Sequence, residues 1–165
     1  MPTKATIEKS KRDKREGKSA STQAGEFVKA EIDKIRKGEH GARNTKQAIA
    51  IGLSEARRAG VDLKPPKKGK TSEKTRKAAR NAYKKGQAHE PISHTRSVAS
   101  EKALKREPRN TVSHSALSRQ TRAAAKKRTA KDRSAAAKKA VRTKGPAERK
   151  AAAKKGARTR ARNNS

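Results

Sequence analysis

Histidine and acidic side chains could give this chain acid–base or metal chemistry, but their spacing favours neither. The four histidines are His40, His89, His94 and His114. His89 and His94 lie five residues apart in a predicted loop, and no acid or thiol stands in a metal-ligand pattern with them. The sequence has no cysteine, no phosphate-binding glycine loop and no apolar pocket that could shift a pKa. We therefore expect no enzyme activity, no cofactor and no metal.

Positive charge is the dominant chemical feature. The 165 residues include 48 Lys and Arg against 15 Asp and Glu, a formal net charge of +33. The excess rises along the chain, from +6 in 1–62 through +11 in 63–110 to +16 in 111–165. Each Lys or Arg that contacts a phosphate releases condensed counterions. The sequence thus predicts binding to a polyanion, with little sequence preference.

The last third of the chain carries the expected contacts. AAAKK occurs at 123–127, 135–139 and 151–155, and the unequal spacing marks a bias in composition rather than a structural repeat. Thirteen basic residues are predicted to act as interchangeable phosphate contacts: Arg119, Arg122, Lys126, Lys127, Arg128, Lys138, Lys139, Arg142, Lys154, Lys155, Arg158, Arg160 and Arg162.

The choice of polyanion rests on aromatic residues. Single-strand binders stack bases on aromatic rings, and this chain has only Phe27 and Tyr83. We therefore expect the protein to bind duplex DNA and to coat or condense the nucleoid, as histone-like proteins do. Two alternatives stay open: an RNA- or ribosome-associated protein, and a protein-interaction module with an electrostatic tail. A membrane partner is not expected, because alanine lines the less polar side of the tail.

The apolar content limits how much of the chain can fold. Ile, Leu, Val and Phe make up about a tenth of the residues, and below about a fifth a highly charged chain is expected to be largely disordered. The expected fold is mostly α: a small helical hairpin head with a largely disordered or nascent-helical basic tail. The predicted parts are a basic disordered arm (1–21), the hairpin head (22–63), a basic linker with short helices (64–112) and a Lys/Ala/Arg-rich low-complexity tail (113–165).

The head is predicted from two amphipathic segments. The first, 22–37, has one apolar stripe interrupted by Glu31, and Gly38 can end it with a left-handed cap. Asn44 can cap the second, 46–59, with Gln47 reaching back as in a capping box. The apolar stripe of the second segment consists of Ile49, Gly52, Leu53 and Ala56.

Two residues of the second segment need an explanation. Gly52 costs about 1 kcal/mol inside a helix, which makes sense only where another backbone approaches closely. Ile51 lies opposite the stripe, so it is either a lone exposed isoleucine or a contact for self-association or a protein partner through residues 22–63.

The expected compartment is the bacterial cytoplasm, at the nucleoid. No apolar run approaches the roughly 20 residues that span a bilayer. The basic N-terminal residues are not followed by the apolar segment of a secretory signal. The lack of cysteine gives no indication of an oxidising compartment.

The segment KQAIAIGLSEARRAG (46–60) resembles one found in an uncharacterised family of small, strongly basic bacterial proteins. The flanking EFVKAEIDKIRKGEHGARNT and VDLKPPKKGK are similar to longer members. SHSALSRQTRAAAKKR and the AAAKK repeats resemble their tails, and also the Lys/Ala-rich tails of linker histones and histone-like nucleoid proteins. The resemblance implies a bacterial, cytoplasmic setting, but no activity and no site residues.

Overall fold

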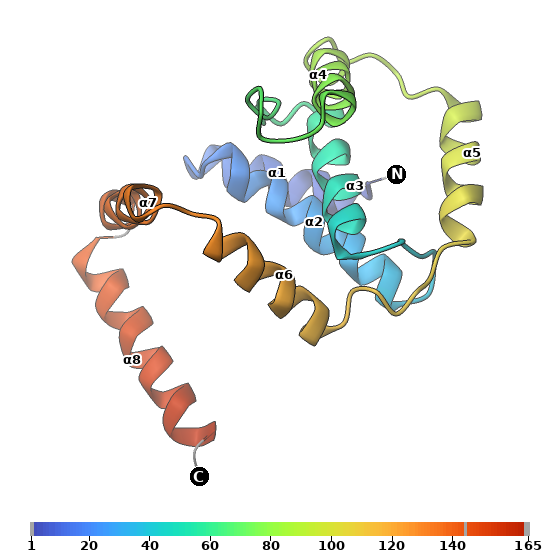
Figure 1. Ribbon diagram of the computed structural model, residues 1–165. Helices are drawn as coiled ribbons and strands as arrows, with labels where there is room; N and C mark the ends of the chain where they lie inside the picture. Colours follow the sequence, from blue (N-terminus) through green and yellow to red (C-terminus); the bar gives the residue numbers. More distant parts are fainter. Residues whose placement is uncertain (1, 144, 164–165) are drawn as a thin grey trace. The chain divides into compact units, whose positions relative to one another are not determined.

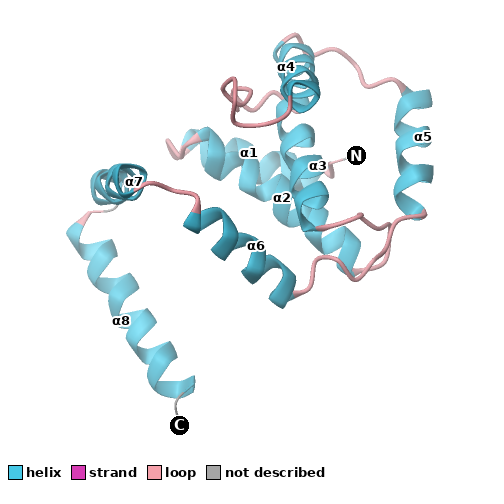
Figure 2. Ribbon diagram, viewed as in Figure 1, coloured by secondary structure: helices cyan, strands magenta, loops and turns pink. Residues whose placement is uncertain are grey.

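The computed structural model describes residues 2–143 and 145–163, and these form eight α-helices joined by loops (Figures 1 and 2). In chain order the helices are α1 (Lys4–Arg15), α2 (Ala20–Arg36), α3 (Thr45–Arg58), α4 (Glu73–Gln87), α5 (His94–Lys105), α6 (His114–Lys126), α7 (Ala130–Thr143) and α8 (Pro146–Asn163). The chain divides into two compact units, and the boundary falls within α6, between Gln120 and Thr121. None of the described helices is long and apolar enough to cross a membrane.

The hairpin predicted from the two amphipathic segments is present as α2 and α3 (Figure 1). A Cβ added to Gly52 would lie 2.6 Å from the Cα of Val28, so the two backbones are nearly in contact there. This confirms the reason inferred for a glycine in the apolar stripe of α3. Ile51 is half-buried rather than exposed.

The expected ends of the hairpin helices are also confirmed. The Asn44 side chain accepts a hydrogen bond from the Gln47 N–H at 3.0 Å, as predicted. The Gln47 side chain accepts from the N–H of Arg43, one residue before the cap, and not from the Asn44 N–H that a capping box would use. Gly38 follows α2 with φ +77°, and Gly60 follows α3 with φ +86°. Both glycines therefore occupy the left-handed region that commonly ends a helix.

The N-terminal arm was wrongly predicted to be disordered, because it contains α1, which packs against α2. Ile7 contacts the first core cluster, whose buried members are Ala24, Phe27, Ala56 and Val61. The buried residues of α1 itself are Thr6, Ser10 and Asp13. These small polar side chains recur at intervals of four and three residues. The buried side of α1 is therefore polar, and the helix lacks the apolar stripe from which amphipathic helices are predicted.

The prediction of a largely disordered or nascent-helical basic tail was wrong, because the described residues of the tail fold mainly into α6, α7 and α8 (Figure 2). Alanine and lysine are strong helix formers, and in these helices that propensity outweighs the repulsion between like charges one turn apart. Local caps add to this propensity. At the start of α7, the Thr129 hydroxyl accepts a hydrogen bond from the Asp132 N–H at 3.1 Å, and the Asp132 carboxylate accepts one from the Thr129 N–H at 3.1 Å. Helix α8 begins with Pro146, a residue favoured at the first helical position.

The segment expected to be a linker contributes to the fold at both ends. The first end is α4, which packs on α3 with Ala79, Ala82 and Gly86 buried. At the other end the chain returns to the α2–α3 loop, where the Gly41 N–H donates to the carbonyl of Leu104 at 2.9 Å.

Val112 completes a second core cluster in the same unit. It is 1% exposed and packs with Ile35, Ala42 and Ala48. The Thr111 hydroxyl donates to the Ala42 carbonyl at 2.9 Å, which fixes the returning chain beside the cluster. The first unit therefore extends well beyond the predicted head.

A buried group of charged side chains lies between α2 and α3. Glu31 is 1% exposed; Lys34 Nζ lies 3.5 Å from a carboxylate oxygen of Glu31 and 3.5 Å from one of Glu55. His40 Nε2 lies 3.5 Å from Glu31 Oε1. Burial, and then the neighbouring Glu55, raise the pKa of Glu31, although His40 and Lys34 oppose the shift.

Candidate nucleic-acid interface

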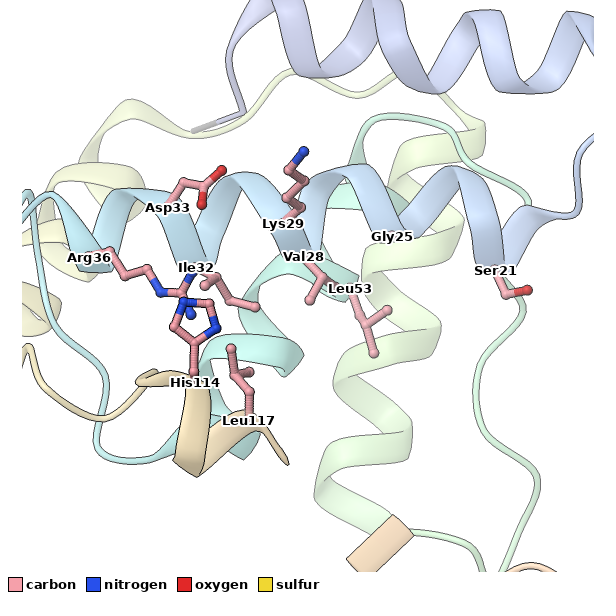
Figure 3. A pocket seen from close by; sticks show the side chains of 10 residues that line it. All are labelled: Ser21, Gly25, Val28, Lys29, Ile32, Asp33, Arg36, Leu53, His114 and Leu117. Atoms are coloured by element: carbon pink, nitrogen blue, oxygen red, sulfur yellow. The ribbon is translucent and has the colours of Figure 1, made fainter. Parts of the chain in front are cut away.

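The first turns of α6 dock onto the first unit through one side of the helix. Ala116, Leu117 and Gln120 are half-buried. Leu117 and His114 line an open groove of about 490 Å³ whose other lining residues come mainly from α2. Figure 3 shows Leu117 directed toward Ile32 and Leu53. The groove thus brings the first turn of α6 against α2 within the first unit.

Two contacts immediately before α6 strengthen this attachment. Arg36 of α2 donates a hydrogen bond from Nε to the carbonyl of Val112 at 3.2 Å. Ser113 caps the helix, because its hydroxyl accepts from the Ala116 N–H at 3.2 Å. The start of α6 is therefore held by a buried valine, a capping serine and a docked leucine.

The opposite side of α6 carries the first group of predicted contacts. Arg119, Arg122 and Lys126 recur at intervals of three and four residues, so they share one face of the helix. All three side chains are exposed. Of the three, Arg119 belongs to the first unit, where helical spacing places it on the side of α6 away from Leu117.

Helix α7 carries most of its basic residues on one side. Lys131, Lys138 and Arg142 lie along that side at helical spacing, next to Lys139. Arg133 lies on the opposite side, and the Val141 side chain is 49% exposed. The basic side of α7 can follow a phosphate backbone without displacing any packed side chain.

Helix α8 carries basic residues around its whole circumference. Lys154, Lys155, Arg158, Arg160 and Arg162 are all exposed and fall on several sides of the helix. Its one acidic residue is Glu148, in the first turn. By helical spacing, Lys154, Lys155, Arg158 and Arg162 share one side of α8 and Arg160 lies on another, so the predicted phosphate contacts are densest on the first side.

All thirteen predicted contacts are exposed, and eleven of them lie on α6, α7 or α8. Lys127 and Arg128 lie in the turn after α6. Arg119 belongs to the first unit and the other twelve to the second. The structure thus places short basic clusters on each helix rather than a single pocket.

Sequence reasoning missed a further basic surface on the first unit. Lys74, Lys77, Arg80 and Lys84 are exposed on α4 and are named here the α4 basic face. They lie on the side of α4 opposite the buried Ala79, Ala82 and Gly86. The helical spacing of these basic residues is the sequence signal for this face.

Other kinds of site find no support in the described residues. No group of three or more His, Asp or Glu there can hold a metal ion. The most strongly buried acid, Glu31, lies within the core between α2 and α3 and not in the groove beside α6.

Residues 3–68 match the model of a family of unknown function (DUF6496). The match covers α1, α2, α3 and the chain just beyond them, in line with the resemblance to an uncharacterised family. No curated protein and no solved structure matches the chain. Helices α4, α6, α7 and α8, which carry the basic surfaces, lie outside the matched residues.

Proposed function

We propose that this protein binds duplex DNA without sequence preference, through phosphate contacts from α6, α7 and α8, and that it coats or condenses the nucleoid. One observation carries the proposal. Residues 121–165 hold 17 Lys and Arg against two acids, and every described Lys and Arg side chain among them is exposed. Counterion release from DNA, which carries one charge per ~1.7 Å of axis, supplies the binding free energy.

The aromatic residues support backbone contacts over base stacking. Phe27 is 0% exposed in the first core cluster. Tyr83 is half-buried, and its hydroxyl donates to Asp62 at 2.6 Å. Neither ring forms part of an exposed stacking platform, which single-strand and sequence-specific RNA binders require.

Salt dependence tests the mechanism. The dissociation constant for a 30-bp duplex is measured by mobility shift between 50 and 200 mM salt. With about ten phosphates engaged, the association constant, which is the reciprocal of this dissociation constant, is expected to fall with a log–log salt slope near −9. Two duplexes of unrelated sequence should give the same value within about twofold, since phosphate contacts carry no sequence information. Affinity that hardly changes with salt contradicts the proposal.

The identity of the polyanion is tested in cells. The protein is crosslinked, recovered and treated with either DNase or RNase before the bound material is analysed. Release by DNase alone supports the proposal. Release by RNase alone replaces DNA with RNA as the partner, and recovery free of nucleic acid contradicts both.

A further inference from the structure

We propose that the α4 basic face is a second phosphate-binding surface and that the protein uses it to hold a second duplex while the tail helices hold the first. This inference rests on the proposed function, because it assumes that the tail binds DNA. It adds a separate site, a separate ligand molecule and a bridging activity.

The charge around α4 is high and mostly uncompensated. Residues 64–87 include ten Lys and Arg and one acid, Glu73. Glu73 pairs with Arg76 through two hydrogen bonds of 2.7 and 2.9 Å, and Lys85 pairs with Glu90 at 3.0 Å. The other eight are exposed and make no ion pair within the described part of the chain: Lys64, Lys67, Lys68, Lys70, Lys74, Lys77, Arg80 and Lys84.

The fold presents the α4 basic face on a fixed helix. A Cβ at Gly86 would collide with the carbonyl oxygen of Arg57, so α4 lies directly against the end of α3. The Tyr83 hydroxyl bonds to Asp62 and the Gln87 side chain donates to the Gly60 carbonyl at 3.3 Å, which tie α4 to the chain that follows α3. The cations on the outer side therefore bind without the cost of ordering a backbone.

The chemistry of this face favours a phosphate backbone over an acidic protein. Its four cations are distributed over eleven residues of helix, or roughly 15 Å. Within the range from Lys74 to Lys84 the outer side includes Asn81 and no large apolar residue. Protein interfaces usually depend on buried aromatic or aliphatic anchors, and this face has none.

Bridging follows from the division of the chain. The α4 basic face belongs to the first unit, whereas twelve of the thirteen tail contacts belong to the second. Two phosphate-binding surfaces on separate units make the protein bivalent, and a bivalent protein can join two duplexes.

The test uses the full-length protein and a capture assay. One duplex is fixed to beads, protein is added, and retention of a second, fluorescent duplex is measured. The α4 variant is Lys74→Gln, Lys77→Gln, Arg80→Gln and Lys84→Gln, and glutamine keeps the helix propensity nearly unchanged. The matched control removes the same charge from the same unit at exposed positions of α1: Lys4→Gln, Lys9→Gln, Lys14→Gln and Arg15→Gln. Circular dichroism checks that both variants are folded.

The α4 variant should lose capture by at least about tenfold, because it lacks the second of two linked binding surfaces. The α1 variant should capture like the wild type, and both variants should still bind a single duplex through the tail. Capture by the α4 variant at the wild-type level overturns the inference. Equal loss of capture in the α4 and α1 variants also overturns it, because total charge would then be the cause. Failure of the wild type to bind even one duplex refutes the proposed function instead.

Discussion

Two glycines set how closely the helices of the first unit can pack. Gly52 meets the backbone of Val28, and Gly86 meets the carbonyl of Arg57. At such positions the lack of a side chain matters more than helix propensity, because backbone atoms cannot move aside as the end of a flexible side chain can.

Gly52→Ala is expected to destabilise the first unit by about 2 kcal/mol or more, although alanine is the better helix former by about 1 kcal/mol. Gly25→Ala in α2 is the matched control, since nothing lies within 4 Å of its added Cβ. It should stabilise by about 0.5–1 kcal/mol. Urea unfolding followed by circular dichroism measures both, and equal effects would contradict the close contact.

The contact between His40 and Glu31 requires a proton. His40 Nδ1 lies 3.1 Å from the carbonyl oxygen of Gly41, which can only accept, so Nδ1 carries a hydrogen. A neutral His40 would then present bare Nε2 to Glu31 Oε1 at 3.5 Å. Protonation of the Glu31 carboxyl, which its raised pKa favours, makes the contact attractive.

The raised pKa of Glu31 predicts a pH-dependent stability. Because the folded-state pKa exceeds the ordinary value of 4.5, this carboxyl contributes stability below pH 4.5 that is lost as pH rises through the folded pKa. Glu31→Gln removes this dependence, while Lys34, Glu55 and His40 remain. Unfolding free energies measured from pH 4 to 8 should show the wild type losing stability relative to the variant as pH rises. Parallel curves would contradict the assignment.

At the scale of elements, the second core cluster depends on a residue far along the chain. Val112→Ala is expected to cost about 2 kcal/mol, from lost apolar burial and the cavity left behind. Val141→Ala removes the same atoms from an exposed side chain of α7 and should be nearly neutral. Urea unfolding of the two variants gives the comparison, and a neutral Val112→Ala would exclude residues 104–113 from the folded core.

The sequence predicted those elements whose pattern is local. Asn44, Gly38 and Gly52 each have a recognisable role within a few residues of a helix end or stripe, and the structure confirms the hairpin they define. The position of Val112 could not be predicted, because its partners lie 64 or more residues earlier in the chain. Helix α1 was missed because its buried side is polar. The tail helices were expected to be nascent at most because the apolar content is low, whereas their helicity follows from the propensity of alanine and lysine.

For the candidate site, the sequence predicted which side chains are basic but not which faces carry them. That Arg119 lies on the side of α6 away from the groove depends on the docking of Leu117 in the first unit. The α4 basic face had a local pattern and could have been found. The close packing of α4 on α3 could not have been predicted, since it depends on the contact between Gly86 and the carbonyl of Arg57.

At the scale of the whole molecule, function is spread over many equivalent charges. Any single change among the thirteen tail contacts, such as Arg158→Gln, is expected to lower the magnitude of the salt slope by about 0.9. Changing Lys138, Arg142, Lys154 and Arg158 together should lower it by about 3.6. Mobility shifts across the salt series measure both, and a single substitution that abolishes binding would indicate a specific pocket instead.

The long-range contacts of the first unit determine when it can be completed during synthesis. Hydrogen bonds from Arg36 to Val112 and from Thr45 to Thr111 join residues 76 and 66 positions apart. Chains emerge at about 5–20 residues per second, so the gap between the end of α3 and Val112 corresponds to roughly 3–10 s of translation. Throughout that interval Ile35 and Ala48 of the nascent hairpin lack the valine that completes their cluster in the folded chain.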